Sequence, residues 1–334
     1  MSNQMDHAID FVITWVDGDD PAWQTEKQKY VDQELSKKSD VAGKERYEDN
    51  GLLRYWFRGV EQFAPWVRKI FFVTWGHLPS WLNVNNPKLV IVKHQDFLPA
   101  NYRPTFNSVS LNLNLHRIEG LSERFVYFND DMYLVSPCAP QLFFKKGLPR
   151  DMAVQDVIPA TGRTAYWSMV YNDIIMLNNA VSKKSCIKKH LFKWMSLKYG
   201  KNLIKNILLS PLALFTGIYE THLPASYLKV SYSKIWKKYE TELNEVSTHK
   251  VRCHDDISEN FIRYVQMAEG NFCPINKLKY GRYCSMKSKK LYQYIVGQKY
   301  KYLCINDNGT SEEVAHIKNA FDKILNQPSS FELN

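Results

Sequence analysis

The sequence has no uninterrupted apolar stretch as long as a membrane-spanning helix. Its longest apolar region, residues 207–219, contains a serine, a threonine, a proline and a glycine, and it falls short of the roughly 20 residues that a spanning helix needs. Residues 1–7 are polar and carry no basic leader, long apolar core or small-residue cleavage site. Such a start does not predict a secretory signal peptide. We therefore expect a cytoplasmic protein.

Paired cysteine motifs are also missing. The six cysteines are scattered, and no two of them form the Cys-x-x-Cys pair that is typical of zinc and redox sites. A chain of this size without a signal peptide is expected to keep its thiols reduced. We predict structural thiols rather than disulfides or a zinc site, although an even number of cysteines leaves disulfides as the alternative.

Acidic residues are fewer than basic ones, 34 against 44, which gives a formal net charge of +10. This excess favours anionic partners, whether nucleic acid, anionic lipid or a phosphorylated small molecule. The basic residues are dispersed, and we find no recognition helix or RNA-binding signature. A nucleic-acid partner is therefore not expected. The 45% hydrophobic and 23% charged residues are typical of a folded globular chain, and 334 residues suffice for one large or two modest domains.

Strand-like and helix-like segments alternate in the first part of the chain. Runs of β-branched and aromatic residues predict strands at residues 10–16, 70–75, 89–93 and 124–128. Helices are expected at 22–36, at 51–63 with Asn50 as a candidate cap, and from Asn107 or Ser108 to Arg117, with a polar loop over 37–50. The alternation predicts a parallel or mixed sheet covered on both faces. Ligands bind such sheets at the carboxyl ends of the strands, where the acidic turns 17–20 and 130–131 would lie.

The second part of the chain differs in composition and is richer in basic, helix-like segments. Residues 179–199 form a strongly basic, helix-like stretch that Gly200 would close. A helix is expected over 258–269, followed by a strand over 301–305 and a final helix over 311–326 that begins with a capping box at Ser311. The late strand runs into an Asn-Asp-Asn-Gly turn, so a strand followed by an acidic turn occurs a third time.

The acidic turns offer oxygen ligands. Asp130 and Asp131 at a strand end could bind Mg²⁺ or Mn²⁺, which prefer oxygen donors and leave coordination positions open for phosphate. The alternative is an ordinary turn in which Asn and Asp tolerate unusual backbone angles, and the same alternative holds for Asp17 and Gly18.

Two further side chains could act on a phosphorylated substrate. The imidazole of His222 could take a proton from an acceptor hydroxyl, although eight other histidines offer the same chemistry. The guanidinium of Arg252 could clamp a phosphate, or it could pair with Asp255 and Asp256. Each of these signals is weak by itself.

Together, these segments resemble the Stealth protein family. The run IDFVITWVDGDDPAW at residues 9–23 is similar to the family's opening signature. A second block is similar in the following segments: RYEDNG at 46–51, LRY at 53–55, APWVRKI at 64–70, PTFNS at 104–108, LHRI at 115–118 and YFNDD at 127–131. The motif THLP at 221–224 with Arg252 and Asp256 looks like the third block, and LCINDN at 303–308 looks like the fourth. One departure is Trp75-Gly76-His77, where many relatives have a smaller or acidic residue after the strand.

The resemblance implies transfer of a sugar-1-phosphate. The family includes bacterial capsular polysaccharide phosphotransferases and the animal enzyme that tags lysosomal glycoproteins with N-acetylglucosamine-1-phosphate. This chain lacks the long insertions of the animal members, so the bacterial surface-polysaccharide branch fits better. The implied donor is a UDP-activated hexose or N-acetylhexosamine, and the implied acceptor is a saccharide or lipid-linked saccharide. The implied cofactor is Mg²⁺, with Mn²⁺ as an alternative, and the products are a phosphodiester and UMP.

The resemblance also assigns roles to single residues. The implied catalytic residues are Asp131, His222, Arg252 and Asn306, and the implied metal ligands are Asp130 and Asp131. The implied donor-binding residues are Trp15, Asp17, Gly18, Arg54, Asn107 and Arg117. His222 would remove the proton, Arg252 would stabilise charge and Asn306 would orient the phosphate or a metal-bound water. The spacing leaves open whether Asp131 or His222 is the base.

The expected fold is α/β, Rossmann-like and glycosyltransferase-A-like, with a mixed sheet, helices on both faces and a mainly helical insertion. We divide the chain into a nucleotide-sugar-binding half at 1–140, an acceptor region at 141–300 with His222 and Arg252, and a final strand and helix at 301–334 that complete the core. The alternative function is a metal-dependent glycosyltransferase that releases UDP, because acids at strand ends serve both reactions.

The basic stretch and the apolar region after it, residues 179–219, raise one more expectation. A basic helix beside an apolar loop could lie on an anionic membrane surface, which would place the protein peripherally at the inner face of the plasma membrane. The alternative is a solvated helix that covers a loop of the core.

Overall fold

The computed structural model describes residues 8–35, 50–159, 164–306 and 309–333. The predicted polar loop therefore lies outside the described residues except for Asn50. The same is true of the first four residues of the second family block and of Asp307 and Asn308 in the last one. None of the described helices combines the length and the apolar character that crossing a membrane requires.

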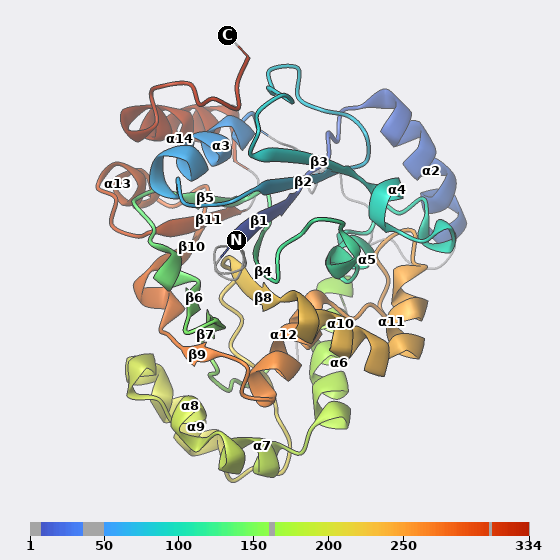
Figure 1. Ribbon diagram of the computed structural model, residues 1–334, viewed down its shortest axis with the longest axis vertical. Coiled ribbons are helices and arrows are strands. Elements are labelled where there is room, and N and C mark those ends of the chain that lie inside the picture. The colour runs from blue at the N-terminus through green and yellow to red at the C-terminus, as the bar shows by residue number, and fades with distance from the viewer. Residues whose placement is uncertain (1–7, 36–49, 160–163, 307–308, 334) are drawn as a thin grey trace, which may run out of the picture.

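The centre of the molecule is a five-stranded mixed sheet with the order β3-β2-β1-β4-β8 (Figure 1). Its strands are β1 (Ile9–Thr14), β2 (Ile70–Thr74), β3 (Leu89–Lys93), β4 (Arg124–Phe128) and β8 (Ala225–Leu228). The first four are parallel, and β8 pairs with β4 in the antiparallel direction. The predicted α/β class, mixed sheet and first four strands are confirmed to within two residues at each end.

Helices cover both faces of this sheet, as predicted. In β1, Val12 packs into one hydrophobic cluster, whereas Phe11 and Ile13 pack into the other, because successive side chains of a strand point to opposite faces. The Phe11 and Ile13 side is covered by α3 (Leu53–Phe63) and α14 (Ser311–Ile324). The opposite side is covered by α5 (Ser108–Asn112), α6 (Ala165–Ala180), α10 (Lys229–Lys238), α11 (Glu240–Ser247) and α12 (Glu259–Ala268).

Two small sheets extend the core. In the first, β11 (Tyr302–Asn306) lies between β10 (Gly281–Ser285), which is parallel to it, and β5 (Met132–Leu134), which is antiparallel. The second contains β6 (Phe144–Lys145), β7 (Leu148–Asp151) and β9 (Cys273–Pro274). Because β5 follows directly after the turn at the end of β4, the 130–131 turn joins the central sheet to β11.

The remaining α-helices are α2 (Pro21–Leu35), which has 15 residues, and five shorter ones. The shorter ones are α4 (His94–Phe97), α13 (Leu291–Val296) and the group α7 (Lys183–Lys189), α8 (Leu191–Trp194) and α9 (Leu203–Leu209), which together with α6 form the mainly helical insertion. The 3₁₀ turns are η2 (Ala100–Tyr102), η3 (Leu115–Arg117), η4 (Pro140–Leu142), η5 (Leu197–Asn202) and η6 (Lys277–Lys279).

Helix ends differ from the predictions in three places. Helix α3 starts two residues late, and its cap is Leu52, which makes no side-chain bond, so Asn50 is not the cap. Asn107 does cap α5, through its side chain and the Val109 amide, but the helix ends after five residues and only the 3₁₀ turn η3 follows. The capping box of α14 is formed by Thr310 and Glu313, one residue before the position expected.

The prediction of one continuous basic helix over 179–199 is wrong. Helix α6 ends at Ala180, and Ser182 then caps α7 by accepting a hydrogen bond from the amide of Ser185. A serine that bonds to the backbone in this way starts a new helix instead of extending the old one. Gly200 lies inside η5 with a φ of +59°, where it marks a kink and not a helix end.

The three ranges into which the sequence was divided, 1–140, 141–300 and 301–334, do not have separate hydrophobic cores. The cluster under α3 contains residues of β1, of β5 and of β11 with α14. Strand β8, from the middle range, completes the central sheet. The division of the chain by range remains a prediction about function.

Candidate active site

A cavity of about 1350 Å³ opens at the carboxyl ends of β1, β4 and β11. Its lining includes residues 14–16 after β1, residues 129–131 after β4, residues 219–223 before β8, and Arg252 and Asn306. The acidic turn 130–131 is thus at the predicted edge of the sheet. The other acidic turn is not part of the lining, which takes in Val16 but not residues 17–20.

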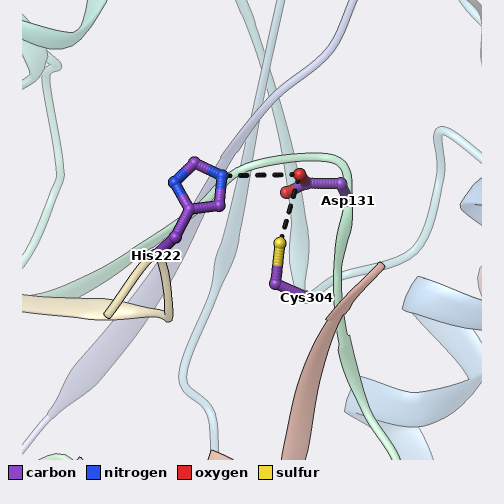
Figure 2. Close-up of side chains that lie close together, drawn as sticks. All are labelled: Asp131, His222 and Cys304. Atoms are coloured by element: carbon purple, nitrogen blue, oxygen red, sulfur yellow. Dashed lines mark hydrogen bonds and ion pairs between the residues drawn. The ribbon is translucent and has the colours of Figure 1, made fainter. Parts of the chain in front are cut away.

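Three of the predicted catalytic residues meet around one carboxylate in this cavity. Oδ2 of Asp131 lies 3.5 Å from Nε2 of His222 and accepts a 2.8 Å hydrogen bond from the Asn306 side-chain amide. The thiol of Cys304 donates to the same oxygen at 3.3 Å. Figure 2 shows the imidazole and the thiol approaching the carboxylate from two different segments of the chain. Residues from three distant parts of the sequence therefore share one site.

The small sheet fixes the position of Asp131. Its backbone carbonyl accepts a hydrogen bond of 2.8 Å from the amide of Ile305 in β11. Cys304, one residue earlier, is fully buried. Burial and the neighbouring charge of Asp131 raise the pKa of the Cys304 thiol well above its ordinary value, so this group stays protonated and acts as a donor.

His222 is held in an unusual backbone conformation. Its φ is +47°, a region that residues with a side chain occupy only when their surroundings hold them there. Its amide donates to Oε1 of Glu220 at 2.8 Å, and Oε2 of Glu220 accepts from the guanidinium of Arg263 at 2.8 Å. Arg263 is buried and also forms two hydrogen bonds to the buried Asp151. A buried ion network thus supports the loop that presents the imidazole.

The charges around the imidazole change its proton affinity. Burial disfavours the charged form, but the hydrogen bond and charge of Asp131, together with the charge of Glu220, outweigh burial and raise the pKa of His222 above its ordinary value. Glu220 itself remains ionised, because the charge of Arg263 outweighs the effect of burial and lowers the pKa of that carboxyl.

The Asp131 carboxylate fits a hard cation. Oδ2 accepts hydrogen bonds from Asn306 and Cys304. Oδ1 is buried and has no hydrogen-bond partner among the described residues. A buried carboxylate oxygen without a partner is costly, and a bound cation would satisfy it. Asp130, the residue predicted as a second ligand, is exposed and lines the same cavity. The donors present therefore fit Mg²⁺ or Mn²⁺.

Arg252 reaches the cavity from a loop that is fastened at several points. Its guanidinium donates to the Ser108 hydroxyl at 3.1 Å. Within the same loop, His249 pairs with Asp256 at 2.7 Å. The other oxygen of Asp256 accepts from the Asn107 side chain, at 3.0 Å. Asn107 is fully buried and does not line the cavity, so this structure gives it a positioning role for the Arg252 loop in place of direct donor contact.

The other predicted donor-binding residues divide into two groups. Trp15 lines the cavity, and its indole Nε1 is buried without a hydrogen-bond partner among the described residues. Asp17 and Gly18 form a turn beside it, where the Asp17 amide donates to the His77 imidazole at 2.7 Å. The departure from the family pattern at His77 thus serves to fasten this turn, and neither Asp17 nor Gly18 lines the cavity.

Arg54 and Arg117 are not brought to the cavity. Arg54 is exposed, lies over the Trp81 ring and approaches Glu332 at 3.8 Å. Arg117 lies over the Trp236 ring and donates to Asn114. Both guanidinium groups thus have partners that the fold itself provides, and neither residue lines the cavity.

Several residues of the site were missed by sequence reasoning. Cys304 lies within the fourth family block but received no role. Glu220 stands two positions before His222, a spacing that gives no signal, and the buried Arg263 lies within a predicted helix that looks ordinary. A pairing of Glu220 and Arg263 is visible only after folding, because 43 residues separate them.

Unpartnered polar atoms concentrate around the cavity. Buried side-chain atoms without a hydrogen-bond partner among the described residues include Trp15 Nε1, Asp131 Oδ1, Thr221 Oγ1 and Asn276 Oδ1, and all four residues line it. Buried polar groups in folded proteins are normally paired, so a group of exceptions in one cavity indicates a site for a polar ligand.

Comparison with known proteins gives matches over nearly the whole chain. The family models described as Stealth protein CR1, conserved region 1, and Stealth protein CR2, conserved region 2, match residues 7–34 and 46–151. Capsular polysaccharide phosphotransferase WcwK of Streptococcus pneumoniae is 37% identical over 97% of this chain and 98% of its own length. Receptor polysaccharide phosphotransferase WefC of Streptococcus oralis is 36% identical, over 97% and 99% respectively.

A third relative and one solved structure also match most of the chain. Exopolysaccharide phosphotransferase cps2G of Lactiplantibacillus plantarum is 34% identical over 97% of this chain and 96% of its own length. The apo structure of the bifunctional glycosyltransferase WbbM covers 95% of this chain and 50% of its own, with a TM-score of 0.38 and 11% identity, values too low to support an inference. The sequence matches to relatives of similar length, and to both conserved regions, show that the chain belongs to the Stealth family.

Proposed function

We propose that this enzyme, a transferase of phosphorus-containing groups, moves a hexose-1-phosphate or N-acetylhexosamine-1-phosphate from a UDP-sugar to a hydroxyl of a saccharide acceptor in a capsular or exopolysaccharide. The reaction forms a phosphodiester and releases UMP. The observation that carries the proposal is the meeting of Asp131, His222 and Asn306 in one cavity of a chain whose relatives are named polysaccharide phosphotransferases.

A nucleotide sugar offers two centres to an attacking hydroxyl. Attack at the anomeric carbon expels UDP, whereas attack at the phosphorus that carries the sugar oxygen expels UMP and keeps the sugar–oxygen bond. The second route conserves the anomeric configuration. Phosphoryl transfer needs mainly alignment of the reacting groups and stabilisation of charge, so the enzyme's side chains act by position and electrostatics.

The geometry favours His222 over Asp131 as the base. Both oxygens of Asp131 have other uses, since Oδ2 accepts from Asn306 and Cys304 and Oδ1 suits a cation. Nε2 of His222 makes a long contact, of 3.5 Å, with Oδ2 of Asp131, and it belongs to a residue that lines the cavity. It can therefore receive the proton of an acceptor hydroxyl, and the adjacent carboxylate stabilises the imidazolium that forms.

The remaining groups bind the donor phosphates. Arg252 carries a planar cation on the cavity wall, which suits the oxygens of a phosphate. Asp130 and Asp131 would hold a magnesium ion, which when bound neutralises phosphate charge during transfer. Asn306 fixes the orientation of the Asp131 carboxylate.

The cavity has room for both substrates. Its volume of about 1350 Å³ exceeds the roughly 300–1000 Å³ of pockets that hold one small ligand. A nucleotide sugar and the end of an acceptor chain can therefore occupy it together, as a direct transfer between them requires.

The test is an incubation of the enzyme with a panel of UDP-sugars, Mg²⁺ and a polysaccharide acceptor fraction, in which the released nucleotide is identified by chromatography. We expect UMP with at least one donor and no turnover after chelation. His222→Gln should lower turnover by about a hundredfold or more, the effect of losing a positioned catalytic group. The matched control is His316→Gln, an exposed histidine on α14 outside the cavity. Release of UDP would overturn the proposal.

A further inference from the structure

The strongest feature outside the active site is an exposed apolar surface on the helical insertion. Large hydrophobic side chains are exposed at seventeen described positions, and eight of these lie within residues 191–214: Leu191, Phe192, Leu197, Ile204, Ile207, Leu208, Leu212 and Leu214. Phe192 is 90% exposed and Leu197 is 87% exposed. Scattered exposed hydrophobics are normal, but a contiguous group marks a surface that binds something apolar.

Helix α9 shows that this exposure is built into the fold. Ile204, Ile207 and Leu208, at positions i, i+3 and i+4, lie on one face of the helix and point to solvent. The opposite face carries Asn206, which is fully buried and bonds to Gln155 and to the carbonyl of Ala153. The apolar face of a surface helix usually faces the core. In α9, the apolar face points to solvent and a polar residue points to the core.

The segment beneath the exposed side chains is firmly held. Trp194, Tyr199 and Phe215 are buried in the main hydrophobic cluster. The ammonium group of Lys183 is drawn inward, where it donates to the carbonyls of Leu209 at 2.7 Å and of Leu214 at 3.0 Å. The exposed residues are therefore presented by a packed base. We name residues 183–214 the basic–apolar arm.

The charge of the basic–apolar arm is of one sign. Residues 183–214 contain eight lysines and neither aspartate nor glutamate. Lys184, Lys188, Lys189, Lys198 and Lys201 are exposed, whereas Lys205 pairs with Asp156. Exposed lysines that alternate along one segment with exposed aliphatic and aromatic side chains match a surface with negative head groups above an apolar interior. A protein partner of mixed charge would be matched by a rim that carries both signs.

The basic–apolar arm also reaches the active site. Lys201 and Asn202, at the end of η5, line the cavity that contains His222 and Asp131. Figure 1 shows α7, α8 and α9 together at the lower end of the molecule, away from the central sheet. A flat surface in contact with the basic–apolar arm would thus lie beside the cavity without covering the sheet.

We propose that the basic–apolar arm docks the enzyme on an anionic lipid bilayer, with Phe192, Leu197 and the outer face of α9 inserted at the level of the head groups and the lysines in contact with lipid phosphates. The docking is peripheral and does not depend on the chemistry proposed above. Its consequence for that chemistry is geometric, because the cavity would open next to the membrane surface, where an acceptor attached to a lipid can enter.

The test is sedimentation of the full chain with phosphatidylcholine vesicles that contain about one quarter phosphatidylglycerol, compared with phosphatidylcholine alone. We expect binding to the anionic vesicles and weak binding to the neutral ones. Binding should decrease from about 0.1 M to about 1 M salt, because the Debye length falls from roughly 10 Å to roughly 3 Å. A protein that stays in the supernatant with anionic vesicles at the lower salt would overturn the proposal.

Variants separate the apolar and the electrostatic contributions. Phe192→Ser with Leu208→Ser should lower the partition coefficient by about tenfold for each side chain. The control is Val230→Ser, an exposed apolar residue on α10.

Neutralisation of three exposed lysines by Lys184→Gln, Lys188→Gln and Lys189→Gln should lower the partition coefficient by about a hundredfold, at roughly fivefold for each charge. The matched control is the equally exposed trio Lys287→Gln, Lys289→Gln and Lys290→Gln. Equal losses in both trios would overturn the docking site.

A second copy of the chain is the alternative occupant of the apolar face. Analytical ultracentrifugation without lipid distinguishes it. We expect a monomer whose sedimentation does not change with Phe192→Ser and Leu208→Ser. A dimer that these substitutions dissociate would assign the face to self-association and overturn the lipid proposal. The nucleotide released from a UDP-sugar in solution is measured separately, so failure of docking and failure of phosphoryl transfer are distinguishable.

Discussion

Replacement of Arg263 with methionine should destabilise the fold by about 3–5 kcal/mol, the usual cost of removing one partner from a buried ion pair. The guanidinium donates to both oxygens of Asp151, at 2.8 and 2.6 Å, and to Glu220 at 2.8 Å. Arg263 and Asp151 have side chains that are each 1% exposed. Without the arginine, Asp151 keeps the amide of Met152 as its hydrogen-bond donor and the charge of Lys277 nearby, and these leave part of a buried charge uncompensated.

The pH dependence of this loss follows from the carboxyl group. Burial would raise the pKa of Asp151, but the charge of Arg263 outweighs it and lowers that pKa below its ordinary value. The ionised pair therefore stabilises the native enzyme above the ordinary carboxyl pKa, and this contribution is lost as the pH falls toward the lowered pKa. In the variant, Lys277 and the Met152 amide still oppose burial, but without Arg263 the pKa of Asp151 should be higher than in the native enzyme. The difference between the two proteins should then be largest near pH 7 and should shrink in acid, because protonation removes the unpaired charge.

The assay is urea unfolding of the native enzyme and Arg263→Met at pH 7 and pH 5, followed by circular dichroism. The exposed Arg103 supplies the control, since Arg103→Met should change the unfolding free energy by less than about 0.5 kcal/mol. The second substitution Asp151→Leu should restore part of the stability of Arg263→Met by removing the unpaired carboxyl. A loss below about 1 kcal/mol at pH 7, or a loss of the same size at both pH values, would refute the reasoning.

Three further outcomes are expected. Burial lowers the pKa of His249, but Asp256 and Cys253 together outweigh burial and raise it to about 10. The stability from these contacts is fully present below the ordinary histidine pKa and declines as the pH rises toward 10, and Asp256→Asn should reduce that decline in urea midpoints between pH 7 and 10. Asp131→Asn should cut turnover by about a hundredfold or more with little change in the urea midpoint, because the amide oxygen can still accept the hydrogen bonds that Oδ2 receives and the buried Oδ1 contributes no bond to the fold. Gly270→Ala should lower the unfolding free energy by about 1–3 kcal/mol in thermal melts, because φ is +79° and the added Cβ would lie 2.3 Å from an imidazole ring.

The sequence predicted the central sheet well because its strands are buried on both faces. Runs such as residues 9–14 and 70–74 are nearly all β-branched or aromatic, which is the pattern of a parallel sheet with helices on both sides. Strands at the edges were missed. Strand β8 has four residues and contains a serine, and β5 has three residues directly after the acidic turn, so neither is long enough to show a periodic pattern.

The active site was predicted only in part, because only some of its residues lie in motifs that the sequence shows. Asp131, His222 and Asn306 follow motifs that can be read along the chain, and the structure brings them together. The supporting contacts from Arg263 and Cys304 depend on long-range packing that no local pattern reports. Arg54 and Arg117 are the converse case. They were predicted to bind the donor from their place in motifs, yet their side chains pack on tryptophan rings away from the cavity.

The central proposal is that the bond formed is to phosphorus and not to the anomeric carbon. The most direct measurement follows the fate of the phosphate next to the sugar, with a UDP-sugar that carries a radioactive label in that phosphate alone. Phosphoryl transfer predicts that the label appears in the acceptor product and that the released UMP is unlabelled, and that Asp131→Asn abolishes both signals. Label recovered in UDP, with none in the acceptor product, would contradict the proposal.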